Sequence, residues 1–422
     1  MKNDIFISIA AYKDPELVPT LRDCIEKAKF PENLHFVICW QYDEDDKYNK
    51  EFLDGVKNKE FGKITVIKIP YKDSKGVCFA RSKIQDEYKD EDYILQLDSH
   101  HRFIKNWDTM LISEIKKLKK QGHKKPILTA YLPSYEPDND PAGRINIPWE
   151  QKFDRFLPQG PAMPQPESID DYKSLKKPVG ARLYSAHFIF SIGDYYKEVL
   201  YDPHLYFHGE EVSLIIRAYT HGYDIFHPHK LVAWHYYTRE GSTKHWDDDP
   251  DWSASNDLSH ARYRQLVGIE DTGIDLGKYG LGTERTLEEY IKYSGIDVSN
   301  KKVHKKTLNR ERPPLKYKSE EEYKNGFCKK IRYCIDLHKS QATTEDCDVW
   351  VVAFKDKEGN DVYRQDCDIN EINQIKQSCP DHQQFYNIWR EYEDNEEPHS
   401  WIVWQHSKSK GWLDIIAGDM PK

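Results

Sequence analysis

One short segment, Tyr93–Asp98, constrains the fold of this chain most, because an apolar run ends there on residues that can bind a metal. The run is typical of a buried parallel strand, and Ser99 and His100 follow it directly. In open α/β sheets, ligands bind at the carboxyl ends of the strands. Asp98 and His100 are two residues apart, so they would project on one side of the extended chain and could share one divalent cation. The alternative is a strand end where Asp98 caps the next helix and the histidines face solvent.

The segments before this strand alternate between strand and helix patterns. Apolar runs predict strands over 5–11, 34–40 and 64–69, and apolar residues at helical spacing predict a helix over 17–28. This alternation predicts an α/β fold with a half-sheet of the nucleotide-binding kind. No Gly-x-Gly-x-x-Gly follows the first strand, which argues against a dinucleotide site.

A glycine turn and an arginine follow the third predicted strand. Gly76 precedes a predicted helix that carries Arg81 in its first turns, and both a helix N-terminus and a guanidinium favour a diphosphate. The alternative is a capped helix with a surface arginine. Further on, the segment 133–168 contains eight prolines and is predicted to be an irregular loop that forms a lid or an acceptor-site wall. A strand is predicted over 183–192, with His187 inside it.

Two later segments carry further candidate site residues. Glu210 and Glu211 open a predicted helix, although acidic residues are favourable at any helix start because of the helix dipole. His235 lies near the end of an apolar run over 231–237, where it could complete an Asp/His/His set of metal ligands. The alternative for His235 alone is a buried, hydrogen-bonded histidine.

Composition narrows the class of protein. The net charge of −9 opposes a broad basic face for nucleic acid, and no apolar run approaches the roughly 18 residues that a membrane span needs. The first strand is predicted to start at Ile5, which leaves no room for a signal peptide and predicts a cytoplasmic protein. The eight cysteines include no Cys-x-x-Cys pair, so reduced thiols are expected, with a zinc site among the C-terminal cysteines as a minor alternative.

A set of motifs in a fixed order gives a more specific indication. In sequence order they are Ser8–Pro15, Gly76–Arg81, Gln96–His100, His208–Glu211, Trp234–His235 and Tyr279–Thr286. Over about residues 4–297 the chain resembles the N-acetylglucosaminyltransferases that modify hydroxyproline on a ubiquitin-ligase adaptor protein. It is more distantly similar to the polypeptide N-acetylgalactosaminyltransferases.

The resemblance implies a glycosyltransferase A-type fold with a mixed, mostly parallel sheet. It also implies a UDP-sugar donor, a Mn²⁺ or Mg²⁺ ion and retention of anomeric configuration. It implies that Asp98, His100 and His235 are the metal ligands and that Glu210 and Glu211 meet the donor sugar or the acceptor. Histidine beside aspartate favours Mn²⁺ over Mg²⁺. The residues expected to contact the donor nucleotide are Ala11, Tyr12, Asp14, Gln41, Arg81 and Asp98.

Beyond residue 300 the pattern changes. A basic segment over 301–319 is expected to be a linker between a catalytic domain at 1–300 and a small β-rich domain at 320–422. Predicted strands at 348–354 and 400–406, with a hairpin turn at 357–360, support the β-rich domain. Its tryptophans could bind an acceptor or a glycan, although core packing is the simpler interpretation.

The function hypothesis is transfer of N-acetylglucosamine, or a related sugar, from a UDP-sugar to a hydroxyl on a protein or glycan. A retaining enzyme needs no enzymic base, whereas an inverting one would use Glu210 or Glu211. The alternatives are a non-catalytic glycan-binding protein of the same fold, a transferase that acts on modified nucleic acid, and a metal-dependent hydrolase. The basic segment is the only support for nucleic acid.

Overall fold

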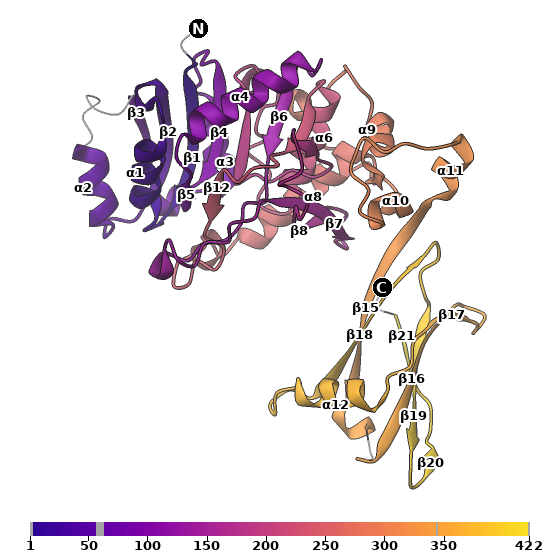
Figure 1. The fold of residues 1–422 in the computed structure, drawn as a ribbon. Coiled ribbons are helices and arrows are strands. Elements are labelled where there is room, and N and C mark those ends of the chain that lie inside the picture. The colour runs from indigo at the N-terminus through magenta and orange to yellow at the C-terminus, as the bar shows by residue number, and fades with distance from the viewer. Residues whose placement is uncertain (1–2, 56–62, 343–344, 421–422) are drawn as a thin grey trace. The chain divides into compact units, whose positions relative to one another are not determined.

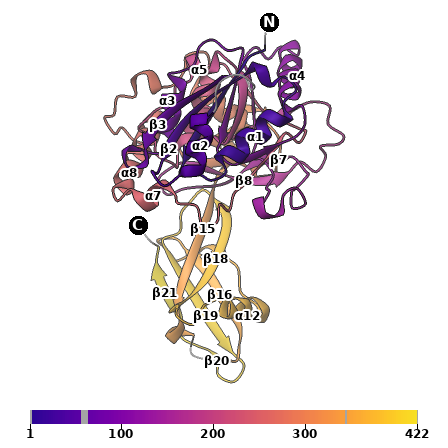
Figure 2. The same ribbon diagram turned by 90° about the vertical axis from the view of Figure 1, so that its left-hand side faces the viewer.

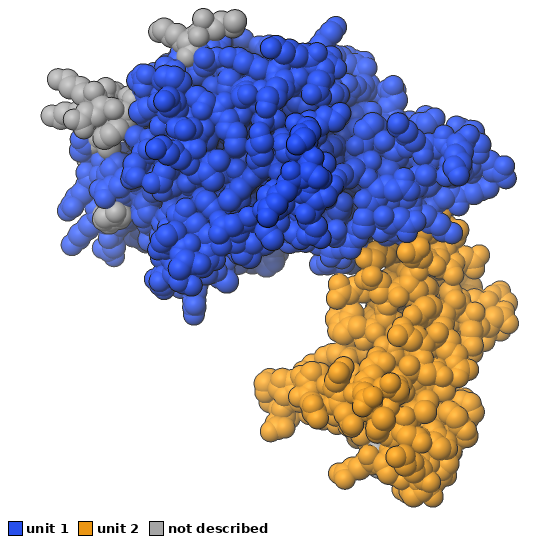
Figure 3. Space-filling view, viewed as in Figure 1, with its two compact units in different colours: residues 1–326 blue, residues 327–422 orange. Residues whose placement is uncertain are grey.

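The computed structural model of the 422-residue chain describes residues 3–55, 63–342 and 345–420. It divides into two compact units, residues 1–326 and residues 327–422, which Figure 3 shows in different colours. None of the described helices is both long enough and apolar enough to cross a membrane.

A mixed sheet forms the centre of unit 1 (Figure 1), and its eight strands within the described residues lie in the order β3-β2-β1-β4-β10-β6-β11-β9. β3, β2, β1 and β4 are parallel to one another, β6 is parallel to β11, and β10 runs antiparallel between β4 and β6. This confirms the predicted mixed, mostly parallel sheet. The strands are β1 (Ile5–Tyr12), β2 (Leu34–Tyr42), β3 (Lys63–Pro70), β4 (Tyr93–Asp98), β6 (Pro126–Thr129), β9 (Val179–Gly180), β10 (Phe188–Ile192) and β11 (Asp224–His227).

Helices pack on both faces of this sheet (Figures 1 and 2), because its strands are apolar on both sides. In β1, Ile5 and Ile7 enter one core while Phe6 enters the other, as the two-residue period of a strand requires. One core includes α1 (Leu17–Lys27), α2 (Lys47–Gly55) and α4 (Trp107–Lys120). The other includes α3 (Val77–Gln85), α5 (Tyr195–Glu198), α6 (Glu210–Thr220), α8 (Trp252–Val267) and α9 (Leu287–Ser294).

The proline-rich segment 133–168 is more regular than predicted. It contains an antiparallel hairpin of β7 (Trp149–Phe156) and β8 (Ala162–Ser168), preceded by a short 3-10 helix at Pro137–Asn139. Pro164 and Pro166 lie in β8 opposite Phe153 and Gln151. A two-stranded hairpin tolerates these prolines because each strand has one edge that needs no N–H donor.

The strand predicted over 183–192 begins later than expected. β10 starts at Phe188, whose N–H donates to the carbonyl of Ser185 in a turn (3.2 Å). His187 therefore lies just before the strand rather than inside it. Nδ1 of His187 is 2.7 Å from Ser185 Oγ, and Nε2 accepts the N–H of Leu132 (3.2 Å).

The segment 301–319, predicted to be a linker, belongs to unit 1. It contains β14 (Lys302–His304), which pairs with β13 (Ile296–Asp297), and the short helix α10 (Lys305–Leu308). Arg312 forms ion pairs with Glu150 and Asp171, both at 3.0 Å. The division between units falls after Gly326, and the helix α11 (Glu320–Asn325) also lies in unit 1.

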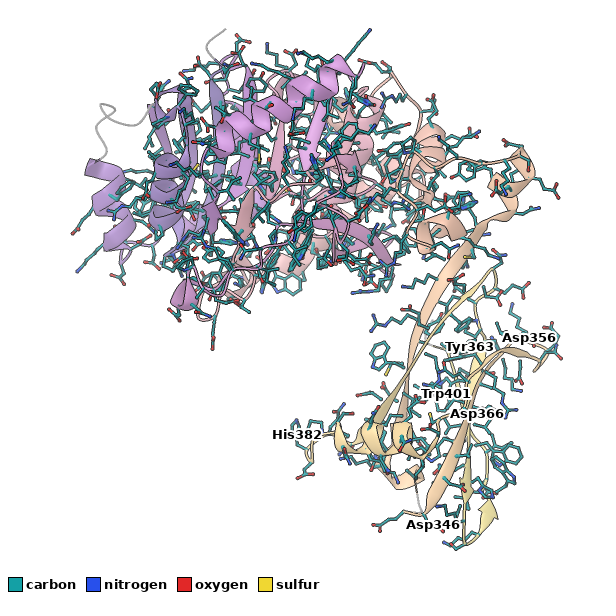
Figure 4. The ribbon with its side chains drawn as sticks, in the orientation of Figure 1. Asp346, Asp356, Tyr363, Asp366, His382 and Trp401 are labelled. Atoms are coloured by element: carbon teal, nitrogen blue, oxygen red, sulfur yellow. The ribbon has the colours of Figure 1, made fainter. Side chains whose placement is uncertain are left out.

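Unit 2 is rich in strands, as predicted. β15 (Phe327–His338) pairs with β18 (Phe385–Asp394), and a second sheet holds β16 (Cys347–Lys355), β17 (Asp361–Arg364), β19 (Ser400–Ser407), β20 (Gly411–Trp412) and β21 (Ile416–Asp419). The helix α12 (Ile369–Gln377) joins the same core. Tyr363 and Trp401, labelled in Figure 4, pack against this core. The tight turn at 357–360 joins β16 to β17.

Candidate functional site

The end of β4 and the two short strands β5 and β12, labelled in Figure 1, carry a carboxylate and two histidines that lie close together. β4 ends at Asp98, and β5 (His101–Phe103) begins three residues later. β12 (Ala233–His235) pairs antiparallel with β5, so His235 lies opposite His101. The N–H of Tyr236 also donates to the carbonyl of His100 (3.1 Å). Strand pairing therefore places His235 next to His100 and His101, which lie far earlier in the chain.

Asp98, His100 and His235 have the spacing of metal ligands. One possible ligand atom from each lies within 4.8 Å of the others. Oδ2 of Asp98 is 3.7 Å from Nε2 of His100 and 3.5 Å from Nε2 of His235. Within the described residues no other group of three His, Cys, Asp or Glu side chains has this spacing, so the C-terminal cysteines form no such cluster there.

The surroundings of the three residues fit a divalent cation. Both ring nitrogens of His235 are buried and have no hydrogen-bond partner among the described residues. Such orphaned groups are costly unless they bind something. Burial lowers the pKa of His235 well below its usual value, which leaves the ring neutral and able to act as a ligand. In the neighbouring His101, Nδ1 lies 3.0 Å from the carbonyl of Asp98, and only Nε2 is buried without a hydrogen-bond partner among the described residues.

Asp14 lies behind His100 and holds its ring. Oδ2 of Asp14 is 2.7 Å from Nδ1 of His100 and accepts the hydroxyl of Ser99 (2.6 Å), while Oδ1 accepts the N–H of Glu16 (2.9 Å). Burial alone would raise the pKa of Asp14, but the His100 ring and Arg239 lower it to about 2. The charged carboxylate therefore favours a proton on Nδ1 of His100 and leaves Nε2 facing Asp98.

Arg81 is held by two carboxylates. Its guanidinium donates to Oδ1 of Asp98 and to Oε1 of Glu210, both at 2.6 Å, and its side chain is only 3% exposed. These bonds orient Asp98 so that Oδ2 faces the two histidines. They engage two nitrogens of the guanidinium that was predicted to contact a diphosphate, whereas Nε of Arg81 is buried and has no hydrogen-bond partner among the described residues.

The candidate ligands line a cleft of about 380 Å³ at the carboxyl ends of β1, β2 and β4. Tyr12 and Gln41, predicted to contact the nucleotide, also line it and lie opposite each other in the register of β1 and β2. Ala11 and Asp14 do not line the cleft, because Ala11 faces the core and Asp14 lies behind His100. The wall opposite includes Ala162, Met163 and Pro164 of β8.

Glu211 lies in an aromatic part of the cleft together with Tyr131, His187 and Tyr237. The rings of Tyr131 and Tyr237 stack with centroids 5.1 Å apart, and the Ala186 N–H donates to Oε1 of Glu211 (2.7 Å). Burial raises the pKa of the Glu211 carboxyl to about 8, although the Ala186 N–H acts in the opposite direction. Glu211 is therefore mainly protonated at neutral pH, whereas Glu210 is paired with Arg81.

The segment 238–248, which we call the mouth loop, supplies cleft residues that the sequence analysis missed. Arg239 and Lys244 line the cleft, and neither Nε of Arg239 nor the Lys244 ammonium has a bonding partner of opposite charge among the described residues. Burial and the nearby Arg239 lower the pKa of Lys244. Two cations soon after His235, separated by Gly241, were the signal that could have identified this loop.

Side chains of the opposite rim hold the mouth loop in place. The hydroxyl of Tyr12 donates to Oδ2 of Asp248 (2.7 Å), and the Lys13 ammonium donates to the same oxygen (3.0 Å). The hydroxyl of Tyr206 lies 2.8 Å from Nδ1 of His245. The loop thus forms one side of the cleft mouth.

The sheet order and the site at its edge define a glycosyltransferase A-type fold with a candidate metal centre at the carboxyl ends of the parallel strands. The chain belongs to the family described as glycosyltransferase (GlcNAc), whose model matches residues 4–60 and 46–300. The matched range contains every residue of the cleft described above. No curated protein matches the chain.

Solved structures show a distant likeness. GalNAc-T7 with UDP, GalNAc and Mn²⁺ is 16% identical, with a TM-score of 0.47 over 63% of this chain and 48% of that one. TarS 1–349 of S. aureus with UDP-GlcNAc is 13% identical, with a TM-score of 0.39 over 68% of this chain and 70% of that one. The mannosyltransferase PcManGT of Pyrobaculum calidifontis with GDP-Man and Mn²⁺ is 10% identical, with a TM-score of 0.36 over 61% and 71%. The chain spans about half the length of the GalNAc-T7 chain.

Proposed function

We propose that this protein is a metal-dependent glycosyltransferase that moves a sugar from a UDP-sugar, with UDP-N-acetylglucosamine as the first candidate, to a hydroxyl on a protein or glycan. The observation that carries the proposal is the convergence of Asp98, His100 and His235 at one cleft, with both nitrogens of His235 buried and unpaired. Membership of the GlcNAc glycosyltransferase family supports the reaction class.

Asp98, His100 and His235 would hold the cation, and two imidazoles favour Mn²⁺ over Mg²⁺. A divalent cation bound there supplies charge stabilisation for the departing diphosphate. The chain's own contribution to that charge would come from Lys244 and Arg239 of the mouth loop, which both line the cleft, although the Arg239 guanidinium also lies 3.5 Å from Asp14. Arg81 would contribute indirectly, because its hydrogen bond orients the Asp98 carboxylate.

Tyr12 and Gln41 are proposed to contact the nucleotide, and Glu211 the donor sugar. A protonated Glu211 would donate a hydrogen bond to the sugar rather than act as a base. Glu210 is paired with Arg81 and is likewise poorly placed to accept a proton. This arrangement favours the retaining outcome, in which the leaving phosphate takes the acceptor proton and no enzymic base is needed.

Ion pairs of the basic segment weaken the nucleic-acid alternative. The basic segment 301–319 forms internal ion pairs, including Arg310 with Glu167 (2.6 Å), Lys306 with Glu322 (3.3 Å) and Arg312 with Glu150 (3.0 Å). These pairs compensate three of the eight basic side chains of the segment and so reduce the positive potential that it offers to phosphates.

The test is a screen of nucleotide sugars by thermal shift and by UDP release, with and without Mn²⁺. We expect one UDP-sugar to raise the melting temperature only with Mn²⁺ and to release UDP slowly by hydrolysis. The variants Asp98→Ala and His235→Ala should lose both responses. His382→Ala is the matched control, because His382 is exposed in unit 2 (Figure 4) and should respond like the wild type. Full activity of Asp98→Ala would refute the proposal, as would the absence of any response to nucleotide sugars.

A further inference from the structure

An aromatic cluster in unit 2 lies outside the range that the family model matches. Trp412 of β20 is 49% exposed, and its ring lies 4.3 Å from Trp404 and 4.9 Å from His406, measured between centroids. Trp404 and His406 are two residues apart in β19 and therefore lie on one face of the sheet, and His406 is opposite Trp412. The other face of β19, with Trp401 and Val403, packs into the core.

The cluster is held rigidly by hydrogen bonds. The Trp404 indole N–H donates to the carbonyl of Leu413 (2.7 Å), and Nδ1 of His406 lies 2.6 Å from Oδ1 of Asp348. At the adjoining turn, Asp346 accepts the hydroxyl of Ser407 (2.7 Å), and Figure 4 shows Asp346 at this end of the unit. Rigid rings lose little conformational entropy when a ligand stacks on them.

We propose that Trp412, Trp404 and the His406–Asp348 pair form a binding platform for a neutral glycan. An aromatic face needs a flat, apolar surface to stack on, and half of the Trp412 side chain is open to solvent. His406 and Asp348 are each about one third exposed beside the rings and offer polar atoms to hydroxyl groups. Sugar rings carry both features, an apolar C–H face and a rim of hydroxyls.

The charges around the platform favour a neutral ligand. The β19–β20 turn carries Lys408 and Lys410, and the carboxylate of Asp348, whose pKa is lowered by His406 and Lys408, supplies opposite charge beside the rings. A platform for single-stranded nucleic acid would combine its rings with a positively charged groove. The platform does not depend on the proposed catalytic function, although glycan binding by one unit would raise the effective concentration of an acceptor for the other.

The test is binding of the full-length chain to an array of neutral oligosaccharides of hexoses and N-acetylhexosamines. Sialylated glycans, sulfated glycans and single-stranded DNA are included on the same array. Binding is measured in EDTA and without nucleotide sugar, so that no transfer takes place. We expect the wild type to bind at least one neutral glycan, and Trp412→Ala to lose about tenfold or more in affinity, the size of one lost stacking contact.

Two control variants make the result specific. Trp389→Ala removes another exposed tryptophan of unit 2, 54% exposed on β18, and should bind like the wild type. Asp98→Ala should also bind normally, which separates this proposal from the catalytic one. The proposal is wrong if the wild type binds no neutral glycan, or if Trp389→Ala loses as much affinity as Trp412→Ala. It is also wrong if only acidic ligands bind, or if Trp412→Ala changes self-association and not glycan binding.

Discussion

Oδ2 of Asp14 lies 2.7 Å from Nδ1 of His100, so a buried carboxylate holds the ring whose other nitrogen faces Asp98. Carboxylates in this position fix the tautomer of a metal-binding histidine and raise its basicity. We therefore expect Asp14 to act through His100 rather than by contacting the nucleotide.

Asp14→Asn should weaken Mn²⁺ binding by about 10–100-fold, because the amide holds the His100 tautomer less strongly. The free Mn²⁺ signal in electron paramagnetic resonance measures this directly, without any turnover. Ser99→Ala, which removes only a hydrogen bond to the same carboxylate (2.6 Å), should have a much smaller effect. Unchanged Mn²⁺ affinity in Asp14→Asn would show that the carboxylate has no role at the metal site.

Arg81→Met should destabilise the metal-free protein by about 3–5 kcal/mol, since it leaves the buried Glu210 and the adjacent Asp98 without their cation. Urea unfolding measures this loss, and circular dichroism shows whether the variant is folded. Arg81→Lys keeps the charge but loses the two-pronged geometry, so an intermediate loss is expected. If Arg81→Met instead had a normal free energy of unfolding but bound the UDP-sugar more weakly, Arg81 would be a contact of the diphosphate.

Lys244→Ala should raise the KM for the UDP-sugar by roughly tenfold and leave the melting temperature unchanged, because one free cation in the cleft is worth about 1–2 kcal/mol to a diphosphate. Steady-state kinetics with the donor varied gives the result. Lys119→Ala on the exposed side of α4 is the charge-matched control. If both lysine variants raised the KM equally, the cause would be the overall charge of the protein and not a contact of Lys244 with the diphosphate.

Glu211 makes stability depend on pH. Its folded-state pKa of about 8 lies above the ordinary value of 4.5, so its stabilising protonated form is lost as the pH rises from about 5 to above 8. Relative to Glu211→Gln, the metal-free wild type should lose roughly 3 kcal/mol between pH 5 and pH 8. Urea unfolding at several pH values measures this difference. The prediction is wrong if the free energy of unfolding depends on pH in the same way in both proteins, as it would if the Glu211 carboxyl were ionised throughout.

Arg312→Ala should release the segment 301–319 from unit 1. The arginine bonds to Glu150, whose side chain is 5% exposed, and to Asp171, which is 51% exposed. Limited trypsin digestion with mass spectrometry should find faster cleavage between residues 301 and 319. Asp171→Asn removes the exposed partner only and should change cleavage little. Equal digestion of Arg312→Ala and wild type would mean that other contacts hold the segment.

Much of the fold could be predicted from local patterns. Apolar runs and helical spacing identified β1, α1, β2, β3 and β4 to within a few residues. The hairpin of β7 and β8 was missed, because prolines suggest irregular backbone and only pairing between distant residues makes Pro164 acceptable in a strand. The basic segment 301–319 looked like a linker because its ion-pair partners, such as Glu150, lie far away in the sequence.

The sequence by itself indicated the pair of Asp98 and His100, because the two residues lie two positions apart at the end of an apolar run. It also indicated His235, by its position near the end of an apolar run. Only the tertiary structure decided what surrounds them. The pairing of β5 with β12 brings His235 close to Asp98. Asp14 contacts His100 from the segment between β1 and α1, and Arg81 is bound by Asp98 and Glu210. These relationships depend on register and packing between distant segments, which no local pattern encodes.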